Sequence, residues 1–389
     1  MPERGQRPHP AIEGVPKTKI AVIGCGDYRE ETVGEAVRRS TDLFGGIRSL
    51  IKPHDRVLIK PNLLKASPPD RAVTTHPEIV RAVIRLVHEA GAEALIGDSP
   101  GIGDLRRVAE RSGILAVVRQ EGAVLAEFDD AVTVKNTGRF QRFEIARAAA
   151  EADAIINLPK FKTHGMTTLT GAVKNLFGCI PGKRKVQWHF NTGVDHGSFM
   201  RMLVELSAFL KPRFTIMDGI VGMEGNGPGS GDPRTMGVLL AGQDPVAIDS
   251  VAGALVGLTP ETLPVLKAAA AAGKGETRIE NIQIVGDELS RFVVRDFRLP
   301  PREHPEWRIP EFLRKRLKEA LTTRPVIDHG RCIRCGICRK DCPQQAITEH
   351  HHTLAIDHRI CIRCFCCQEF CPQGAITVGR GWMLKTFGR

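Results

Sequence analysis

The stretch CIRCFCCQEFCP (residues 361–372) contains five cysteines, one more than a site with four thiolate ligands uses. A related stretch, CIRCGICRKDCP (332–343), begins 29 residues earlier and contains four. When the two are aligned, four cysteines of the later stretch meet a cysteine, whereas Cys366 meets the apolar residue Ile337. We therefore interpret Cys366 as a small buried apolar residue and the other eight cysteines as metal ligands.

The spacing C-x2-C-x2-C-x3-C-P occurs in both stretches and resembles that of bacterial two-cluster ferredoxins. The likeness covers residues 326–379 and includes PQQAIT (343–348) and PQGAIT (372–377), which follow the cysteines. In that family the first three cysteines of a run bind one cluster and the fourth binds the other. The resemblance implies one [4Fe-4S] cluster on Cys332, Cys335, Cys338 and Cys371, and a second on Cys342, Cys361, Cys364 and Cys367.

Structural zinc and disulfides are the alternative uses of these cysteines. Zinc sites pair two C-x2-C knuckles and need neither the third cysteine nor the terminal Cys-Pro. Disulfides are typical of short secreted chains, whereas the N-terminal sequence MPERGQRPHP is polar and lacks an apolar signal segment. Of the 11 cysteines, only Cys25 and Cys179 lie outside the last sixty residues. These features predict an iron–sulfur protein of a reducing cytoplasm that serves anaerobic metabolism.

The composition of the whole chain indicates a large domain joined to a small one. Its 389 residues are 42% hydrophobic and 25% charged, which is ordinary for a globular protein. No apolar run approaches the roughly 18 residues of a membrane-spanning helix. The formal net charge of +11 favours an acidic redox partner protein or an anionic small-molecule substrate. Nucleic acid is disfavoured as a partner, because one Tyr and three Trp provide few stacking platforms for bases.

Short apolar runs alternate with amphipathic segments between residues 18 and 288. The clearest helix is HPEIVRAVIRLVHEAGA (76–92), whose apolar residues form one stripe before Gly91. This alternation predicts an α/β fold with a mostly parallel sheet covered by helices. The predicted strands are 18–23, 56–60, 93–97, 153–158, 214–218 and 237–242, and the predicted helices are 31–51, 76–90, 104–112, 198–210 and 244–257.

The segment between the two domains is rich in proline and charge. Leu313, Leu317 and Leu321 recur every four residues and predict a short amphipathic helix. We interpret it as a strut between the domains, because its polar face also carries Glu311 and Glu319; binding to an anionic membrane surface is the alternative. The predicted organisation is a polar arm (1–17), the α/β domain with an anion site at its strand ends (18–297), the linker (298–325), a ferredoxin-like α+β two-cluster domain (326–379) and a tail (380–389).

Polar residues follow four of the predicted strands. They are KPN (60–62), GDSP (97–100), PKFKTH (159–164) and DGIVG (218–222). In open parallel sheets ligands bind outside the carboxyl ends of the strands, where such loops meet. Each motif alone is compatible with an ordinary turn, so the prediction depends on all four together. The first two supply the candidate binding residues Lys60, Asn62 and Ser99, and Asp98 as a candidate acid, base or metal partner.

The densest group of basic residues lies in NLPKFKTHGMTTLTGAVKNLFGCIPGKRK (157–185). A helix over 166–177 would place a positive dipole end near the lysines, which favours a carboxylate or phosphate. His164 is the candidate proton donor, and Asp249, inside an apolar helix, is expected to pair with a lysine. A solvated basic loop is the alternative. The candidate binding residues here are Lys160, Lys162, Thr167, Lys174 and Asn175.

One further loop, GMEGNGPGSGDP (222–233), is rich in glycine. Glycine lets a loop approach a ligand closely or act as a lid, although a merely flexible loop has the same composition. The loop lacks the Gly-Lys-Ser/Thr ending of a P-loop, so it gives no support to nucleotide binding by that route.

Taken together, KPN, GDSP, PKFKTHGMTTLTGAVKN with GCIPGKRK, and DPVAIDSVA resemble the domain-of-unknown-function family numbered 362 across residues 18–288. The resemblance implies an α/β architecture and an association with iron–sulfur clusters, but no substrate. We therefore expect a redox protein with two [4Fe-4S] clusters that exchanges electrons with an anionic substrate or cofactor, and a ferredoxin-linked oxidoreductase activity is the enzyme hypothesis. The alternative is a non-enzymatic electron carrier or maturation factor whose large domain binds an acidic protein.

Overall fold

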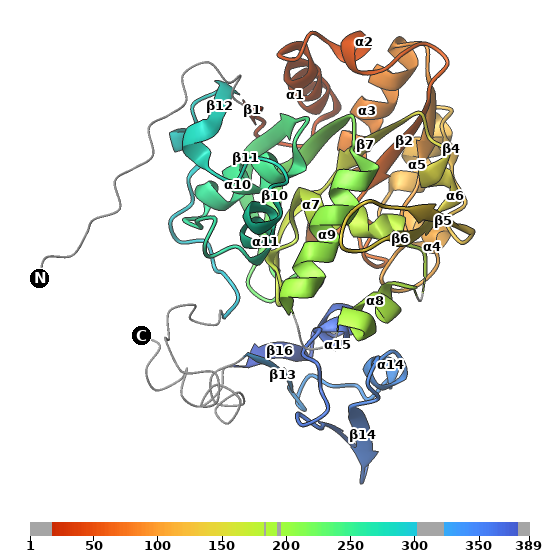
Figure 1. Ribbon diagram of the computed structural model, residues 1–389, viewed down its shortest axis with the longest axis vertical. Helices are drawn as coiled ribbons and strands as arrows, with labels where there is room; N and C mark the ends of the chain where they lie inside the picture. Colours follow the sequence, from red (N-terminus) through yellow and green to blue (C-terminus); the bar gives the residue numbers. More distant parts are fainter. Residues whose placement is uncertain (1–17, 183, 193–195, 302–322, 380–389) are drawn as a thin grey trace, which may run out of the picture.

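The computed structural model describes residues 18–182, 184–192, 196–301 and 323–379 (Figure 1). The predicted N-terminal arm, the linker helix around Leu317 and the C-terminal tail lie outside these ranges. Within them the chain forms a large α/β domain and a small C-terminal module that lies against one end of it (Figure 1).

A single mixed sheet organises the large domain. Its main strands follow the order β12-β1-β11-β10-β7-β2-β3-β4, and most neighbours are parallel. The exception along this path is β11, which runs antiparallel to both β1 and β10. The expected α/β fold with a mostly parallel sheet is therefore confirmed. The strands are β1 (Thr18–Gly24), β2 (Arg56–Pro61), β3 (Glu93–Ile96), β4 (Val124–Leu125), β7 (Ala154–Leu158), β10 (Phe214–Glu224), β11 (Asp232–Gly242) and β12 (Ile282–Gly286).

Helices bury both faces of this sheet. Along β1, Ala21 and Ile23 belong to one apolar core and Ile20 and Val22 to the other, because successive side chains of a strand point to opposite faces. All four side chains are fully buried. Because both faces of the sheet are covered, the sequence of such a strand is apolar at every position. One face is covered by α1 (Glu30–Asp42), α2 (Ile47–Leu50), α3 (Pro77–Glu89), α4 (Leu105–Arg111) and α5 (Ile114–Gln120), and the other by α7 (Gly171–Asn175), α9 (His196–Leu210), α10 (Pro245–Leu255) and α11 (Pro264–Ala272).

The structure refines two segments of the predicted large domain. The helix expected over 31–51 is interrupted after α1, because Gly45 and Gly46 adopt φ values of 89° and 80° that a helix does not accommodate. The glycine-rich segment 222–233 contains the predicted loop at 225–231, and its ends belong to an antiparallel hairpin, because β10 extends to Glu224 and β11 begins at Asp232. Only the tip of this hairpin is a loop.

A short strand, β8 (Lys160–His164), lies beside the main path of the sheet. It pairs with β10 in parallel and with β9 (Thr168–Leu169) in antiparallel orientation. The prediction that PKFKTH forms a loop is therefore wrong, and all five residues of β8 are buried. A separate hairpin, β5 (Ala131–Lys135) and β6 (Arg142–Ala146), leads into α6 (Arg147–Ala150).

The C-terminal module is built twice from the same plan, as its sequence repeat predicts. Each half has a cysteine loop, a short helix and a strand, and β13 (Arg324–Ile327) pairs with β16 (Ile376–Gly379). The small apolar core includes Cys338, Ile347, Cys367 and Ile376. The remaining elements are α14 (Ile337–Lys340), β14 (Ile347–His350), β15 (Thr353–Ile356) and α15 (Cys366–Phe370).

Side-chain contacts from α15 and its neighbours join the module to the large domain. Glu369 Oε1 lies 2.6 Å from His164 Nε2, and Gln368 hydrogen-bonds Asn226 in the tip of the β10–β11 hairpin. Lys65 Nζ also donates to the Cys371 carbonyl at 3.4 Å. The helix α15 also lies next to α8 (Arg184–Thr192) (Figure 1).

Candidate functional site

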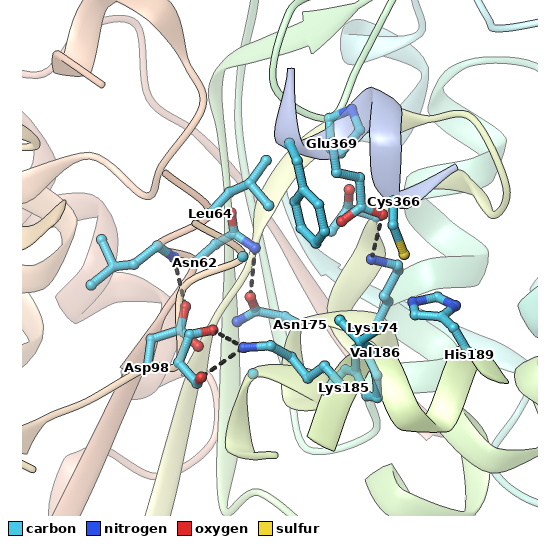
Figure 2. Close-up of a pocket in the computed structure, with 18 of the residues that line it drawn as sticks. Asn62, Leu64, Asp98, Lys174, Asn175, Lys185, Val186, His189, Cys366 and Glu369 are labelled. Carbon is cyan, nitrogen blue, oxygen red and sulfur yellow. Dashed lines mark hydrogen bonds and ion pairs between the residues drawn. The ribbon is translucent and has the colours of Figure 1, made fainter. Parts of the chain in front are cut away.

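A pocket lies between the large domain and the C-terminal module (Figure 2). It encloses about 700 Å³, counting the space open to solvent at its mouth. The large domain contributes residues that follow β2 and β3, residues of β8 and α7, and residues of α8, whereas the module contributes α15. The polar residues of its wall are Asn62, Asp98, Ser99, Lys162, Thr170, Lys174, Asn175, Lys185, His189, Cys366 and Glu369.

The ends of β2 and β3 meet at this pocket, as the strand-end argument predicts. Lys60 Nζ lies 2.7 Å from Asp98 Oδ1, and neither side chain is more than 5% exposed. The other carboxylate oxygen of Asp98 accepts a hydrogen bond from the Leu63 backbone N–H. Asp98 thus neutralises Lys60 and fixes the loop after β2, while Asn62 and Ser99 form part of the wall.

Three lysines give the pocket its basic character. Lys162 Nζ donates to Asn62 Oδ1 and to the Val73 carbonyl, both at 2.7 Å. Burial and the nearby Lys174 ammonium hold the pKa of Lys162 well below its usual value. Lys174 Nζ lies 3.7 Å from Glu369 Oε1, a longer separation than a hydrogen bond (Figure 2).

Lys185, the third lysine, is on α8 and was not among the predicted site residues. Its Nζ donates to the Ser99 carbonyl and hydroxyl and to the Pro100 carbonyl, at 2.5 to 2.9 Å. Burial lowers the pKa of Lys185 to about 8, against the opposing charge of Asp98. The lysine thereby attaches α8 to the loop after β3.

Lys160 does not line the pocket, although it was predicted as an anion ligand from PKFKTH, the motif that also contains Lys162. Its Nζ is 2.7 Å from Asp218 Oδ2 and donates to the Tyr28 hydroxyl at 2.8 Å. Tyr28 in turn donates to the second carboxylate oxygen of Asp218. Both members of this ion pair are buried, so the structure gives Lys160 a partner within the sheet.

His164 is also buried behind the pocket. Its Nδ1 accepts hydrogen bonds from the backbone N–H groups of Met166 and Thr167, and its Nε2 faces Glu369. Burial and the Lys174 charge lower the pKa of His164 to about 4, against the attraction of Glu369. The Thr167 hydroxyl donates to the Leu169 carbonyl and likewise points away from the pocket wall.

Asp249 does not pair with a lysine, and that expectation is wrong. Its carboxylate accepts hydrogen bonds from the backbone N–H groups of Ala172 and Val173, in the first turn of α7. Burial raises the pKa of Asp249 to about 7 despite these two donors. The residue caps α7 from the neighbouring helix α10, and it does not line the pocket.

Five polar pocket residues were missed or assigned another role: Thr170, Lys185, His189, Cys366 and Glu369. Lys185 lies in the motif GCIPGKRK, whose cluster of basic residues was the available signal. Glu369 and Cys366 reach the pocket only because the module packs on the large domain, which no local pattern shows. The prediction that Cys366 is buried is confirmed, since it is 2% exposed, but it lies in the pocket wall.

Two further cavities lie inside the module. One is lined by Cys332, Cys335, Cys338 and Cys371, and the other by Cys342, Cys361, Cys364 and Cys367. These sets are the same as those the ferredoxin resemblance implies, and their assignment as cluster ligands stays a prediction. Backbone N–H groups of Ala346, Arg363 and Ala375 point at the sulfur atoms of Cys342, Cys361 and Cys371.

The donor arrangement fits iron–sulfur clusters better than zinc. Within the described ranges, no three His, Cys, Asp or Glu side chains converge closely enough to hold a single metal ion. Each set of four cysteines instead surrounds a space with apolar walls, about 360 Å³ and 340 Å³ in the two cases when the space open to solvent is counted. A [4Fe-4S] cluster takes four thiolates around a larger inorganic core, and hydrogen bonds to its sulfur ligands are usual.

Comparison with known proteins identifies both domains. The profile of the domain of unknown function DUF362 matches residues 57–254, and that of a 4Fe-4S dicluster domain matches residues 324–372. A thylakoid-associated protein of Synechocystis sp. is 37% identical over 300 residues, which cover 77% of this chain and 93% of that protein.

Solved structures show only a distant likeness. The lactate racemase apoprotein from Thermoanaerobacterium thermosaccharolyticum matches with a TM-score of 0.39 and 13% identity, over 58% of this chain and 54% of that one. A protein from Thermotoga maritima matches with a TM-score of 0.34 and 14% identity, over 56% of each chain. The chain thus spans about half the length of each, and a likeness this weak shows nothing about the site.

None of the helices in the described ranges combines the length and apolar character that a membrane span requires. The dicluster module gives the protein the capacity for iron–sulfur electron transfer. The chain therefore belongs to the DUF362 family and carries a C-terminal 4Fe-4S dicluster domain.

Proposed function

We propose that this protein carries two [4Fe-4S] clusters and exchanges electrons with an anionic substrate or cofactor bound in the pocket between its domains. The observation that carries the proposal is the position of α15. This helix includes Cys367, a predicted ligand of the second cluster, and it also contributes Cys366, Glu369 and Phe370 to the pocket wall. A molecule in the pocket would therefore lie next to the polypeptide that holds the second cluster.

The clusters, when bound, supply one electron each. The chain's own residues position the other participants. Asn62 and Ser99 fix the strand-end wall, and Lys162, Lys174 and Lys185 make the pocket attractive to negative charge. The pairing of Glu369 with His164 holds α15 against the large domain and so keeps the pocket closed on the module side.

The two predicted cluster sites differ in exposure, which supports a direction along the module. Cys335 of the first set is exposed, whereas the four cysteines of the second set are buried or half-buried, and one of them, Cys364, packs against a core of the large domain. Around the first set, Ile333 is 60% exposed, and Arg331 and Arg334 are exposed as well. An acidic redox partner would meet this outer face by charge attraction, so electrons would enter or leave the protein there.

The enzyme proposed here is a ferredoxin-linked oxidoreductase of the cytoplasm, used in anaerobic metabolism. The second candidate is a non-enzymatic electron carrier or maturation factor that binds an acidic protein. Its support is the basic outer face of the module. A pocket built from both domains favours the first candidate, since a carrier needs no such site.

Anaerobic purification tests the proposal. Two clusters require about eight iron and eight sulfide per chain, and reduction should produce the paramagnetic signals of [4Fe-4S] clusters. Mass spectrometry should find a small anion that co-purifies with the wild type and is depleted from Lys174→Ala. One zinc per cysteine set without sulfide would contradict the cofactor assignment, and the absence of any such anion would favour the electron carrier.

A further inference from the structure

Several polar groups in the pocket wall lack the partners that burial normally demands. Thr170 is 4% exposed, and its hydroxyl oxygen has no hydrogen-bond partner within the part of the chain that the structure describes. Lys174 Nζ has Glu369 as its ion-pair partner, but at 3.7 Å. A buried hydroxyl without a partner and a loosely paired ammonium both gain from a ligand that supplies acceptor oxygens.

His189 is the third group of this kind. It is 6% exposed and lines the pocket (Figure 2), with its ring stacked on Phe199 at 4.2 Å and at an edge to Phe177. Among the described residues, its ring nitrogens make no hydrogen bond, whereas His164 uses both of its own. The aromatic contacts fix the plane of the His189 ring and leave its nitrogens to the cavity.

Another part of the wall is apolar. Leu63, Leu64, Phe177, Val186 and Phe370 line the pocket together with the polar groups. A small inorganic anion would leave this surface facing water, whereas an organic anion with an apolar body would cover it. The wall thus has a polar part with a hydroxyl, an ammonium and an imidazole, and an apolar part that includes two aromatic rings.

We propose that the pocket binds an organic carboxylate with an apolar body, which the Thr170 hydroxyl and the Lys174 ammonium hold by its oxygens while His189 takes up a proton. This inference rests on the proposed function, because it names the class of substrate that the same pocket binds. The proton comes from solvent through the pocket mouth, and no bond of the ligand changes on binding.

The electrostatic surroundings of His189 explain why a proton would accompany the anion. Burial, against the attraction of Glu369 and with a smaller contribution from the Lys174 charge, lowers the pKa of His189 to about 3, so the ring is neutral in the open pocket at neutral pH. The groups that face it are Glu369 on α15, Lys174 on α7, His164 on β8 and His196 on α9. A carboxylate brought next to the ring favours the imidazolium, so affinity should rise as pH falls from neutrality.

Anaerobic titration calorimetry of the cluster-loaded protein with trans-cinnamate, in two buffers of different ionisation enthalpy, tests this. We expect saturable binding, with uptake of up to about one proton per bound anion near neutral pH and tighter binding at lower pH. Thr170→Val should weaken binding about tenfold or more, because it removes a hydrogen bond to a charged group. His189→Gln should retain binding but abolish proton uptake.

The exposed residues Lys267 and His88 provide matched controls, and Lys267→Ala and His88→Gln should behave as the wild type. Iron content and thermal unfolding establish that each variant is folded. Absence of saturable cinnamate binding up to about 10 mM overturns the inference, as does equal binding by Thr170→Val and the wild type. Sulfate binding as tight as cinnamate would make this a site for inorganic oxyanions. If cinnamate binds as expected but no ligand exchanges electrons with the clusters, the inference stands and the proposed function fails.

Discussion

At the scale of single residues, the lysines of this protein show what a sequence pattern can and cannot predict. The motif KPN and the motif PKFKTH were both expected to expose their lysines, yet Lys60 and Lys160 are buried in ion pairs with Asp98 and Asp218. Lysine is almost never fully buried without a partner, and these partners are 38 and 58 residues away in the chain. The segment Lys-Phe-Lys-Thr-His contains one apolar residue in five, so apolar alternation gives no signal for the strand β8.

Replacing Lys160 by alanine should destabilise the fold without acting on the pocket. The change leaves the Asp218 carboxylate buried without its cation, and we expect this to lower the free energy of unfolding by about 4 kcal/mol. Denaturant unfolding of the anaerobic protein measures this. Lys267→Ala on the surface is the control and should shift stability by no more than about 0.5 kcal/mol. Unchanged stability together with lost cinnamate binding would instead make Lys160 an anion ligand.

The choice of Cys366 as the cysteine that binds no cluster has its own test. Cys366→Ala should leave the iron content unchanged, because the residue lines the pocket and not the cavity of the second set. Cys367→Ala should lower it, since that cavity would lose one of four thiolates. Iron and sulfide analysis of both variants decides the assignment. The reverse order of iron contents would mean that Cys366 is the ligand.

At the scale of helices and strands, most of the architecture was predictable. The alternation of apolar and amphipathic segments located β1, β2, β3, β7, β10 and β11, because strands that are buried on both faces of a sheet consist of continuous apolar runs. The helix predicted from 166 to 177 is shorter in the structure, with α7 spanning Gly171–Asn175. Its start depends on Asp249, which caps it from another helix. A cap supplied 77 residues away leaves no signal near the helix that it starts.

This cap should make stability depend on pH. The pKa of Asp249 is about 7 in the folded protein and 3.8 for an unperturbed aspartate, so the folded state binds the proton more tightly. The unfolding free energy should therefore fall as pH rises through this interval and then level off above it. In Asp249→Asn this contribution is absent. The unfolding free energies of the two proteins are compared by denaturant unfolding between about pH 5.5 and pH 8, because iron–sulfur clusters are labile in acid. Parallel pH profiles would show that Asp249 is ionised throughout.

At the scale of the whole molecule, the sequence predicts both domains but not the site between them. The cysteine repeat and the family motifs are each local, whereas the pocket exists because α15 packs on the strand ends through Glu369 and His164. Asn62, Ser99, Lys162, Lys174 and Asn175 were predicted as binding residues and do line it. Their contribution to binding stays a prediction. His189 and Lys185 come from α8, a helix that was not predicted.

The outer face of the module should determine how fast an acidic electron carrier reacts. With a reduced acidic [2Fe-2S] ferredoxin as donor, electron transfer should slow about tenfold or more when this face is made acidic, because charge steering is lost. The wild-type rate should also fall as salt rises towards physiological strength, where the screening length is about 8 Å. Stopped-flow reduction measures both effects. The test variant combines Arg331→Glu, Arg334→Glu and Lys340→Glu.

A charge-matched variant of the large domain separates steering at this face from the effect of net charge. It combines Lys52→Glu, Lys267→Glu and Lys274→Glu, all at exposed positions. This control should react nearly as the wild type does, and both variants should be reduced by dithionite at the wild-type rate. Equal slowing in both, or a wild-type rate independent of salt, would show that the partner binds elsewhere.

The central claim is that electrons pass between the module and a molecule in the interdomain pocket. The most direct measurement is the reoxidation of anaerobically photoreduced protein after rapid mixing with the anion that co-purifies with it, followed by the visible absorption of the clusters. The account predicts rapid, saturable reoxidation by the wild type, and slower reoxidation with a higher half-saturation concentration for Lys174→Ala. Reoxidation no faster with the anion than without it, or the same in both proteins, would contradict the account.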